Sequence, residues 1–390
     1  MKKSGLNLIG VKEFNRALIL QLISTSSKTT RNNLAKASKL TSMTLTNITS
    51  ELLQQNIIVE SDMENDVKNV GRNPKYLTIS PHSPLVAGIW VSKDFLFGIL
   101  SDFSLKLIAA KREEFQPDET PDTILQRIWH LADHLLHLSE RPILGIGIST
   151  IGVVDTIHGI IKNVTNFFNI KELDIMGYLQ PRLPVPVFVK NDMQAAALCE
   201  MYYGIGQEKE NFLYIGLANG IASAIVSNRQ LVNNLTGSCG ELGHTTINFD
   251  GPKCNCGNRG CLELYASVPV ILSKINEACG TEFTVFREAM EYCKTSPKAY
   301  SILENVSEQF AYALNNLINI IDISTLVFGH SAFYLPDEIL ASIAYTVNQI
   351  SIFKNNRTIR IFKTRFEDNS ALYGSVCIVL DQLFTGKITV

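Results

Sequence analysis

The chain has 390 residues, of which 46% are apolar and 18% are charged, and its net charge is −2. This composition is typical of a globular protein of two or three domains, and no apolar run reaches the roughly 18 residues that a membrane span needs. The first residues are polar and lack the apolar core of a secretion signal, so we expect a cytoplasmic protein without membrane contact.

The charge is unevenly distributed along the chain. Residues 1–80 contain eleven Lys and Arg against six Asp and Glu, a net charge of +5, so the remaining residues carry −7. A basic N-terminal segment on an acidic body suggests an anionic partner for that segment alone.

Two helices are predicted at the start of the basic segment. The first, over about 11–24, places apolar side chains at helical spacing: Phe14, Leu18, Ile19 and Leu22. Thr30 can cap a second helix, which we expect to bury three side chains: Leu34, Ala35 and Ala37. A short turn then leads to a third helix.

The third predicted helix begins at Thr41 or Ser42 and has two different faces. Its apolar face consists of Leu45, Ile48, Leu52 and Leu53. The opposite face consists of Ser42, Met43, Thr44, Thr46, Asn47 and Ser50. Apart from Met43, these are short, uncharged, hydrogen-bonding side chains, which suit base edges and phosphates in a DNA major groove.

A hairpin is predicted after these helices, with strands at 57–60 and 76–79 and a basic tip at 71–75. Arg72 beside Gly71 is typical of a minor-groove probe. Together these elements predict a winged helix-turn-helix over 1–80. The alternative is a small helical domain that binds another protein; the tight turn, the hairpin and the uncharged third helix favour DNA.

Residues 81–84 form a proline-containing linker to a body over 85–390, in which strands alternate with helices. This alternation predicts an α/β body of two lobes, split near 195–210, with a C-terminal helix that returns to the first lobe. Strands are expected at 85–91, 95–100, 106–111, 143–149, 187–189, 212–217, 221–226 and 325–328. Helices are expected at 120–140, from 191, at 267–278, 284–293 and 297–320, and after 368. A cleft between the lobes is the expected ligand site.

A dense group of metal-binding residue types lies near the middle of the chain. Cys254, Cys256 and Cys261 follow His244 within 18 residues, and the chain has eight cysteines in all. Three thiolates and one imidazole complete a tetrahedral zinc shell, and four protein ligands imply a structural rather than catalytic ion. The spacing therefore indicates metal chemistry in a reducing compartment and not a disulfide framework.

The run from Cys254 to Glu263, preceded by Glu241–His244, resembles the signature of the ROK family of sugar kinases and sugar-responsive repressors. The resemblance covers 11–390 and implies a two-lobed actin-like fold. It implies Zn²⁺ at His244, Cys254, Cys256 and Cys261. It also implies sugar contacts at Asn191, Asp192, Glu241, His244 and Glu263, with Asn166 as a weaker candidate. The repressor branch of the family, which includes xylose and N-acetylglucosamine repressors, carries an N-terminal winged helix-turn-helix.

Two departures from the family pattern bear on activity. The kinases hold ATP phosphates in two glycine-rich loops, and the matching segments are Gly88–Ser92 and Gly216–Ala224. The first has no aspartate or paired glycines and contains Trp90, which would crowd a phosphate. The second departs from the GTGxGGG pattern of the kinases, whose glycines let backbone amides approach a phosphate. Asp192 matches the kinases' catalytic base, but a base without a phosphoryl donor performs no transfer. We therefore expect no catalytic residue and no enzyme activity, with Asp192 kept as a sugar ligand.

The expected function is a repressor that binds a palindromic DNA operator as a homodimer or homotetramer, with a monosaccharide or a monosaccharide derivative as effector. The third helix and Arg72 would contact DNA, and sugar would act by moving the lobes. The alternatives are a hexose kinase and a repressor controlled by a protein partner.

Overall fold

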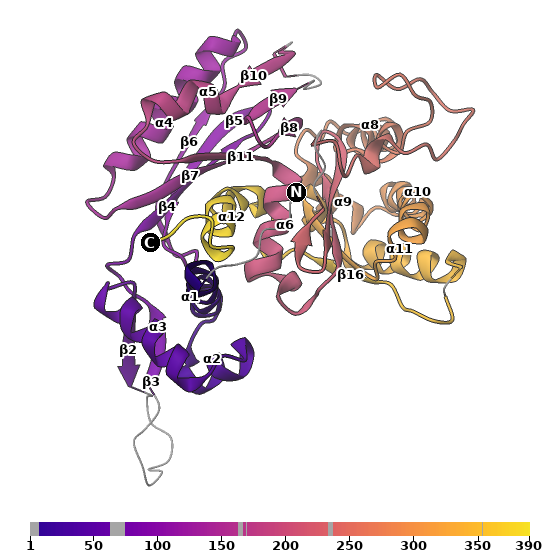
Figure 1. Cartoon of the computed structure of the whole chain (residues 1–390). Coiled ribbons are helices and arrows are strands. Elements are labelled where there is room, and N and C mark those ends of the chain that lie inside the picture. The colour runs from indigo at the N-terminus through magenta and orange to yellow at the C-terminus, as the bar shows by residue number, and fades with distance from the viewer. Residues whose placement is uncertain (1–7, 63–74, 163–166, 169, 233–236, 353) are drawn as a thin grey trace. The chain divides into compact units, whose positions relative to one another are not determined.

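The structure of the chain, a computed structural model, describes residues 8–62, 75–162, 167–168, 170–232, 237–352 and 354–390 (Figure 1). The chain divides into a first unit, Met1–Lys190 with Ser375–Val390, and a second unit, Asn191–Gly374. The predicted split near 195–210 lies slightly C-terminal to this division, because the whole helix after Asn191 belongs to the second unit. Among the described residues, no helix combines the length and apolarity needed to cross a membrane.

The N-terminal part of the first unit contains three helices and a small sheet, in the order that a winged helix-turn-helix requires. The elements are α1 (Leu8–Ser24), β1 (Thr29–Thr30), α2 (Arg31–Ser38), α3 (Ser42–Gln54), β2 (Ile58–Asp62) and β3 (Lys75–Ile79). The strands have the order β1-β3-β2, and the antiparallel β2–β3 register runs from Ile58 opposite Ile79 to Asp62 opposite Lys75. Residues 71–74 of the predicted hairpin tip, including Arg72, lie outside the described residues, whereas Lys75 begins β3.

Side-chain caps set the turn between α2 and α3. The Thr30 hydroxyl accepts a hydrogen bond from the Asn33 amide at 3.3 Å, and the Thr41 hydroxyl accepts one from the Thr44 amide at 3.2 Å. Lys39 ends α2 in the left-handed conformation, with φ of 57°. Both helix starts were predicted from Thr30 and Thr41, and both predictions are confirmed, because a threonine oxygen satisfies an amide that the first helical turn leaves unpaired.

The predicted buried faces of α1 and α2 are partly wrong. Of the predicted residues of α1, Ile19 is buried, Leu18 and Leu22 are half-buried and Phe14 is 51% exposed. Ala17, Leu20 and Ile23 are also buried. In α2 only Leu34 is buried, whereas Ala37 is exposed. The C-terminal half of α1 is apolar on several sides, so the spacing of its apolar residues could not select the face that packs against the rest of the domain.

The rest of the first unit is built on a five-stranded sheet of order β11-β7-β4-β5-β6. Its strands are β4 (Leu85–Val91), β5 (Phe95–Ser101), β6 (Leu107–Glu114), β7 (Ile143–Thr150) and β11 (Val187–Asn191). Helix α4 (Pro121–His137) covers one face, where Leu131 and Leu135 contact Gly98. The part of α12 (Ser370–Phe384) from Ser375 onward covers the other face, where Ser375 lies against Gly88 (Figure 1).

Smaller elements of this unit were missed from the sequence because each is very short. Three strands form a second sheet of order β10-β9-β8, followed by one helical turn and a 3-10 turn. They are β8 (Val153–Asp155), β9 (Ile160–Lys162), β10 (Glu172–Asp174), α5 (Ile175–Leu179) and η1 (Gln180–Arg182). The described part of this unit therefore agrees with the α/β prediction and adds elements too short to show a period.

The second unit is built on a sheet of order β14-β13-β12-β15-β16. Its strands are β12 (Phe212–Leu217), β13 (Ile221–Ser227), β14 (Gln230–Leu231), β15 (Thr325–His330) and β16 (Arg360–Lys363). Its helical elements are α6 (Asp192–Tyr203), η2 (Ile205–Glu208), η3 (Leu242–His244), α7 (Glu263–Ala266), α8 (Val268–Cys279), α9 (Phe286–Cys293), α10 (Pro297–Ile321), η4 (Ser331–Tyr334) and α11 (Asp337–Ile350). The sequence did not predict α11 or β16.

The two faces of this sheet carry different helices. Met193 of α6 contacts Gly216 on one face of β12. Leu213, Ile215 and Leu217 point to the opposite face and join the core formed with α8 to α11. The N-terminus of α6 is therefore held on the sheet face that is not filled by the main core.

Candidate metal centre, effector site and DNA-binding helix

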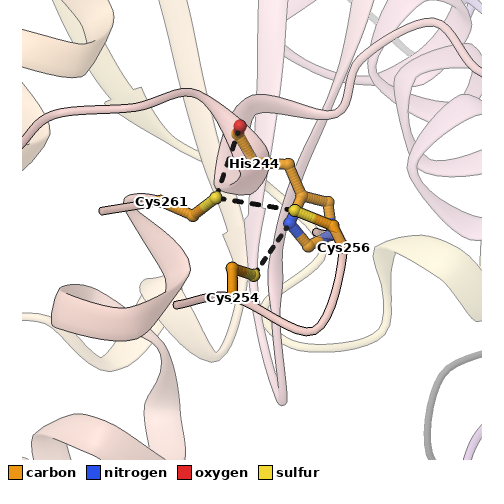
Figure 2. A group of neighbouring side chains, drawn as sticks. All are labelled: His244, Cys254, Cys256 and Cys261. Atoms are coloured by element: carbon orange, nitrogen blue, oxygen red, sulfur yellow. Dashed lines mark hydrogen bonds between the residues drawn. The ribbon is translucent and has the colours of Figure 1, made fainter. Parts of the chain in front are cut away.

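The predicted metal-binding side chains come together in the second unit. His244 is the last residue of η3, and Cys254, Cys256 and Cys261 lie in the loop before α7 (Figure 2). One nitrogen or sulfur from each residue lies within 4.8 Å of the others. The Cys256 and Cys261 Sγ atoms are 3.7 Å apart, and Cys254 Sγ is 3.7 Å from His244 Nδ1.

These separations suit a zinc shell better than a disulfide. A Zn–S bond of about 2.3 Å places two sulfur ligands of a tetrahedron about 3.8 Å apart. A disulfide needs about 2.05 Å between the sulfur atoms. The four donors therefore have both the chemistry and the spacing for one tetrahedral ion, with His244 contributing Nδ1.

Backbone hydrogen bonds hold the cysteine loop in this shape. The Cys254 amide donates to Asn258 O at 2.8 Å, and the Gly260 amide donates to Pro252 O at 2.9 Å. Gly260 has φ of +61°, and a Cβ there would lie 1.6 Å from Asn248 O. A side chain at that position would overlap the backbone, so the loop shape requires glycine there.

The proposed sugar ligands also lie in the second unit. Asn191 caps α6, and its side-chain oxygen accepts a hydrogen bond from the Met193 amide at 2.9 Å. Asp192 follows and is 6% exposed, whereas Glu241 is exposed and Glu263 is half-buried. Asn166 lies outside the described residues.

Electrostatic interactions connect these carboxylates. Burial, together with the charge of Glu241, raises the pKa of Asp192 to about 7. Glu241 interacts in turn with His244 and Glu263. The structure thus places Asp192, Glu241, His244 and Glu263 within one interacting group, although they are separated by up to 71 positions in the sequence. A carboxyl group with a pKa near neutrality can both accept and donate hydrogen bonds at physiological pH.

A buried polar pair beside β12 was not predicted from the sequence. Tyr214 Oη lies 3.0 Å from His330 Nδ1, and both residues are buried. Burial lowers the pKa of His330 to about 4, so its imidazole is neutral at pH 7. His330 Nδ1 also lies beside the Gly216 position where Met193 packs, and Tyr214 lies beside Gly329. The sequence feature that could have indicated this pair is a histidine directly after Gly329, at the end of a buried strand.

The exposed side of α3 matches the predicted DNA-contacting residues. Ser42, Met43, Thr46 and Asn47 are exposed, and Thr44 is half-buried. The Thr44 hydroxyl lies 2.9 Å from the Thr41 hydroxyl and thus belongs to the helix cap. Of the six side chains predicted on this face, four are therefore exposed, whereas Thr44 and Ser50 are half-buried.

Comparisons with known proteins agree with this architecture. The profile of the ROK family matches residues 88–382. The xylose repressor of Bacillus subtilis is 26% identical over 383 residues, which cover 97% of this chain and 98% of that protein. The DNA-binding transcriptional repressor Mlc of Escherichia coli is 22% identical and covers 97% of this chain.

Solved structures give the same result for the fold. A ROK family transcriptional regulator, described as a homologue of E. coli Mlc, covers 96% of this chain with a TM-score of 0.81 and 22% identity. A ROK hexokinase from Thermus thermophilus covers 75% of this chain and 97% of its own length, with a TM-score of 0.65 and 23% identity. The chain therefore has the two-lobed actin-like ROK fold with an N-terminal helical region.

Proposed function

This chain belongs to the ROK family, and from that premise we propose that it is a transcriptional repressor whose affinity for operator DNA is set by a bound monosaccharide or monosaccharide derivative. One observation carries the proposal. Proteins named as repressors match this chain over 97% of its length, whereas a ROK hexokinase matches only 75% of it. In this proposal residues 1–80 bind DNA, 81–84 form a linker and 85–390 bind the effector.

The proposed metal is one structural Zn²⁺ per chain, held by His244, Cys254, Cys256 and Cys261. The spacing of the four donor atoms supports it. A metal on Nδ1 of His244 leaves the proton on Nε2, so the imidazole can donate a hydrogen bond outward. The ion would then fix the histidine tautomer and anchor the loop that leads to Glu263. Elemental analysis of the purified protein should give one zinc per chain.

The effector site is proposed at Asn191, Asp192, Glu241, His244 and Glu263. Carboxylates accept hydrogen bonds from pairs of hydroxyl groups, and the His244 Nε2–H would donate one, which together suit a neutral polyol. The exposure of Glu241 and the near-neutral pKa of Asp192 support this assignment. Because two relatives are named a xylose repressor and an N-acetylglucosamine repressor, both sugars belong in the first screen.

We propose that the protein does not transfer phosphate. In this chain Gly88–Ser92 belongs mostly to β4, where the half-buried Trp90 ring packs edge-on against Phe95 with centroids 5.1 Å apart. A bulky ring there leaves less room for phosphate oxygens than glycines do. The alternative is a hexose kinase, which the likeness to ROK hexokinase and the position of Asp192 favour.

One pair of assays tests repressor against kinase. Labelled ATP is incubated with the protein and a panel of hexoses and pentoses, and operator binding is followed by electrophoretic mobility with the same panel. The proposal expects no labelled sugar phosphate and a sugar-dependent change in DNA binding. Phosphorylation of a sugar at a rate proportional to protein concentration would establish the kinase alternative.

A further inference from the structure

One side chain on the exposed face of α3 is chemically different from its neighbours. Met43 is 77% exposed, although its side chain is large and apolar. Thr46 and Asn47 are exposed three and four positions later, which places them on the same side of the helix as Met43. All three lie in the first two turns, the part of a recognition helix that reaches base edges in the major groove.

The hydrogen-bonding capacity of this face is limited. The Thr46 hydroxyl donates to Ser42 O at 2.8 Å, so its proton is already used and its methyl group and a lone pair remain. Asn47 retains an amide with two donors and an acceptor oxygen. The face therefore offers an outer thioether, a methyl group, one amide and the exposed Ser42 hydroxyl, which suits either kind of base pair.

Helix α3 itself contributes no charged side chain to this face. Glu51 is the one charged residue in α3. Its carboxylate pairs with Lys12 Nζ at 3.0 Å and with Arg16 Nε at 3.4 Å, both on α1. Guanine is usually read by Arg or Lys and cytosine by Asp or Glu, whereas thymine presents a methyl group and adenine suits an Asn amide. The face lacks the groups that read G·C and has the groups that read A·T.

We propose that Met43 is a specificity-determining residue that contacts a thymine 5-methyl group, with Asn47 on a neighbouring adenine, so that α3 selects A·T pairs in each operator half-site. This inference rests on the proposed DNA-binding function and adds the chemical class of base that is read. Apolar contact with the methyl group buries a side chain that otherwise faces water, which supplies the free energy of discrimination.

The test removes one methyl group at a time from the DNA. The full-length protein first selects its preferred duplex from a randomised pool, and each thymine of that duplex is then replaced by uracil, which keeps the base pair. Burial of one methyl group corresponds to about 0.8 kcal/mol, or roughly a four-fold change in affinity. We expect one uracil position per half-site to weaken wild-type binding roughly four-fold and to leave Met43→Ala unchanged.

Two variants serve as controls. Met43→Leu keeps an apolar side chain and should remain sensitive to the same uracil. Ile157→Ala removes a side chain that is 66% exposed in the turn between β8 and β9 and should behave as wild type. Circular dichroism and thermal unfolding of each variant confirm that an exposed substitution has left the fold intact.

The outcomes separate the inference from the function on which it rests. If no duplex is enriched, the DNA-binding function itself fails. If a duplex is enriched but no uracil position distinguishes wild type from Met43→Ala, the methyl contact is wrong and the repressor function survives. An enriched half-site whose core pairs are all G·C would also overturn the inference.

Discussion

At the scale of single residues, Asp192 is the most informative position of the proposed effector site. Asp192→Ala removes a hydroxyl acceptor at the start of α6 and leaves the helix-turn-helix untouched. A hydrogen bond to a charged group contributes about 1.5–3 kcal/mol, so effector affinity should fall by at least roughly ten-fold. Isothermal titration calorimetry measures the loss of affinity.

The control is Asp250→Ala, which removes an exposed carboxylate of the same unit and should bind effector normally. Equal affinities for the wild type and both variants would remove Asp192 from the site.

The raised pKa of Asp192 also predicts a pH dependence of stability. The pKa is about 7 in the folded protein against an ordinary value of 3.8, so between these values the folded state holds a proton that the unfolded state has lost. Stability therefore falls as pH rises towards 7 and levels off above it. Between pH 5.5 and 8 the loss amounts to about 2 kcal/mol.

The measurement compares wild type with Asp192→Asn by urea unfolding at pH 5.5 and pH 8. The wild type should lose stability relative to the variant as pH rises. His330, whose pKa is lowered to about 4, acts in the opposite direction but is present in both proteins, so its effect cancels in the difference. Parallel stability curves for the two proteins would show that Asp192 ionises normally.

At the scale of elements, the cysteine loop allows a matched test of the metal centre. Gly260→Ala adds a Cβ that would overlap Asn248 O, whereas Gly257→Ala meets nothing within 4 Å; both positions have positive φ. Both variants suffer backbone strain, but only Gly260→Ala should distort the ligand geometry. Competition with a chromophoric chelator should therefore show weaker zinc binding by at least roughly ten-fold for Gly260→Ala than for Gly257→Ala. Equal zinc affinities would show that the loop shape does not set the site.

The elements also show what the sequence could and could not predict. Caps at Thr30 and Thr41 were predictable because they depend on one local side chain and the amides that follow it. The buried face of α1 was not, because Leu18, Ile19 and Leu20 are consecutive apolar residues and the packing partner decides which of them is buried. The His330–Tyr214 pair was missed because its two residues are 116 positions apart and meet only when β12 and β15 pair.

The same contrast holds for the candidate site. The cluster of His244 and three cysteines could be recognised from the sequence because its four residues lie close together along the chain. Asp192 came from the family resemblance alone, because as a residue type it is an ordinary helix start. Its burial and its raised pKa depend on the packing of α6 against β12 and could not be predicted from local sequence.

At the scale of the whole molecule, the small size of one recognition helix predicts a two-fold symmetric complex with DNA. The net charge of +5 over residues 1–80 predicts that binding to DNA depends on salt. One helix reads only a few base pairs, and homo-oligomers usually have two-fold symmetry. Footprinting should show two inverted half-sites about one helical turn apart, and sedimentation should show two or four chains per operator. Affinity should also fall steeply as salt rises. A single half-site occupied by a monomer would contradict this assembly.

The central claim is that a sugar sets the affinity of this protein for its operator. The most direct measurement is a fluorescence anisotropy titration of the labelled operator at fixed salt and pH, with and without each member of a monosaccharide panel. One sugar should change the Kd for DNA by about 5- to 150-fold, the range of a typical coupling between two sites. Tight, specific operator binding that no sugar in the panel alters would contradict the account.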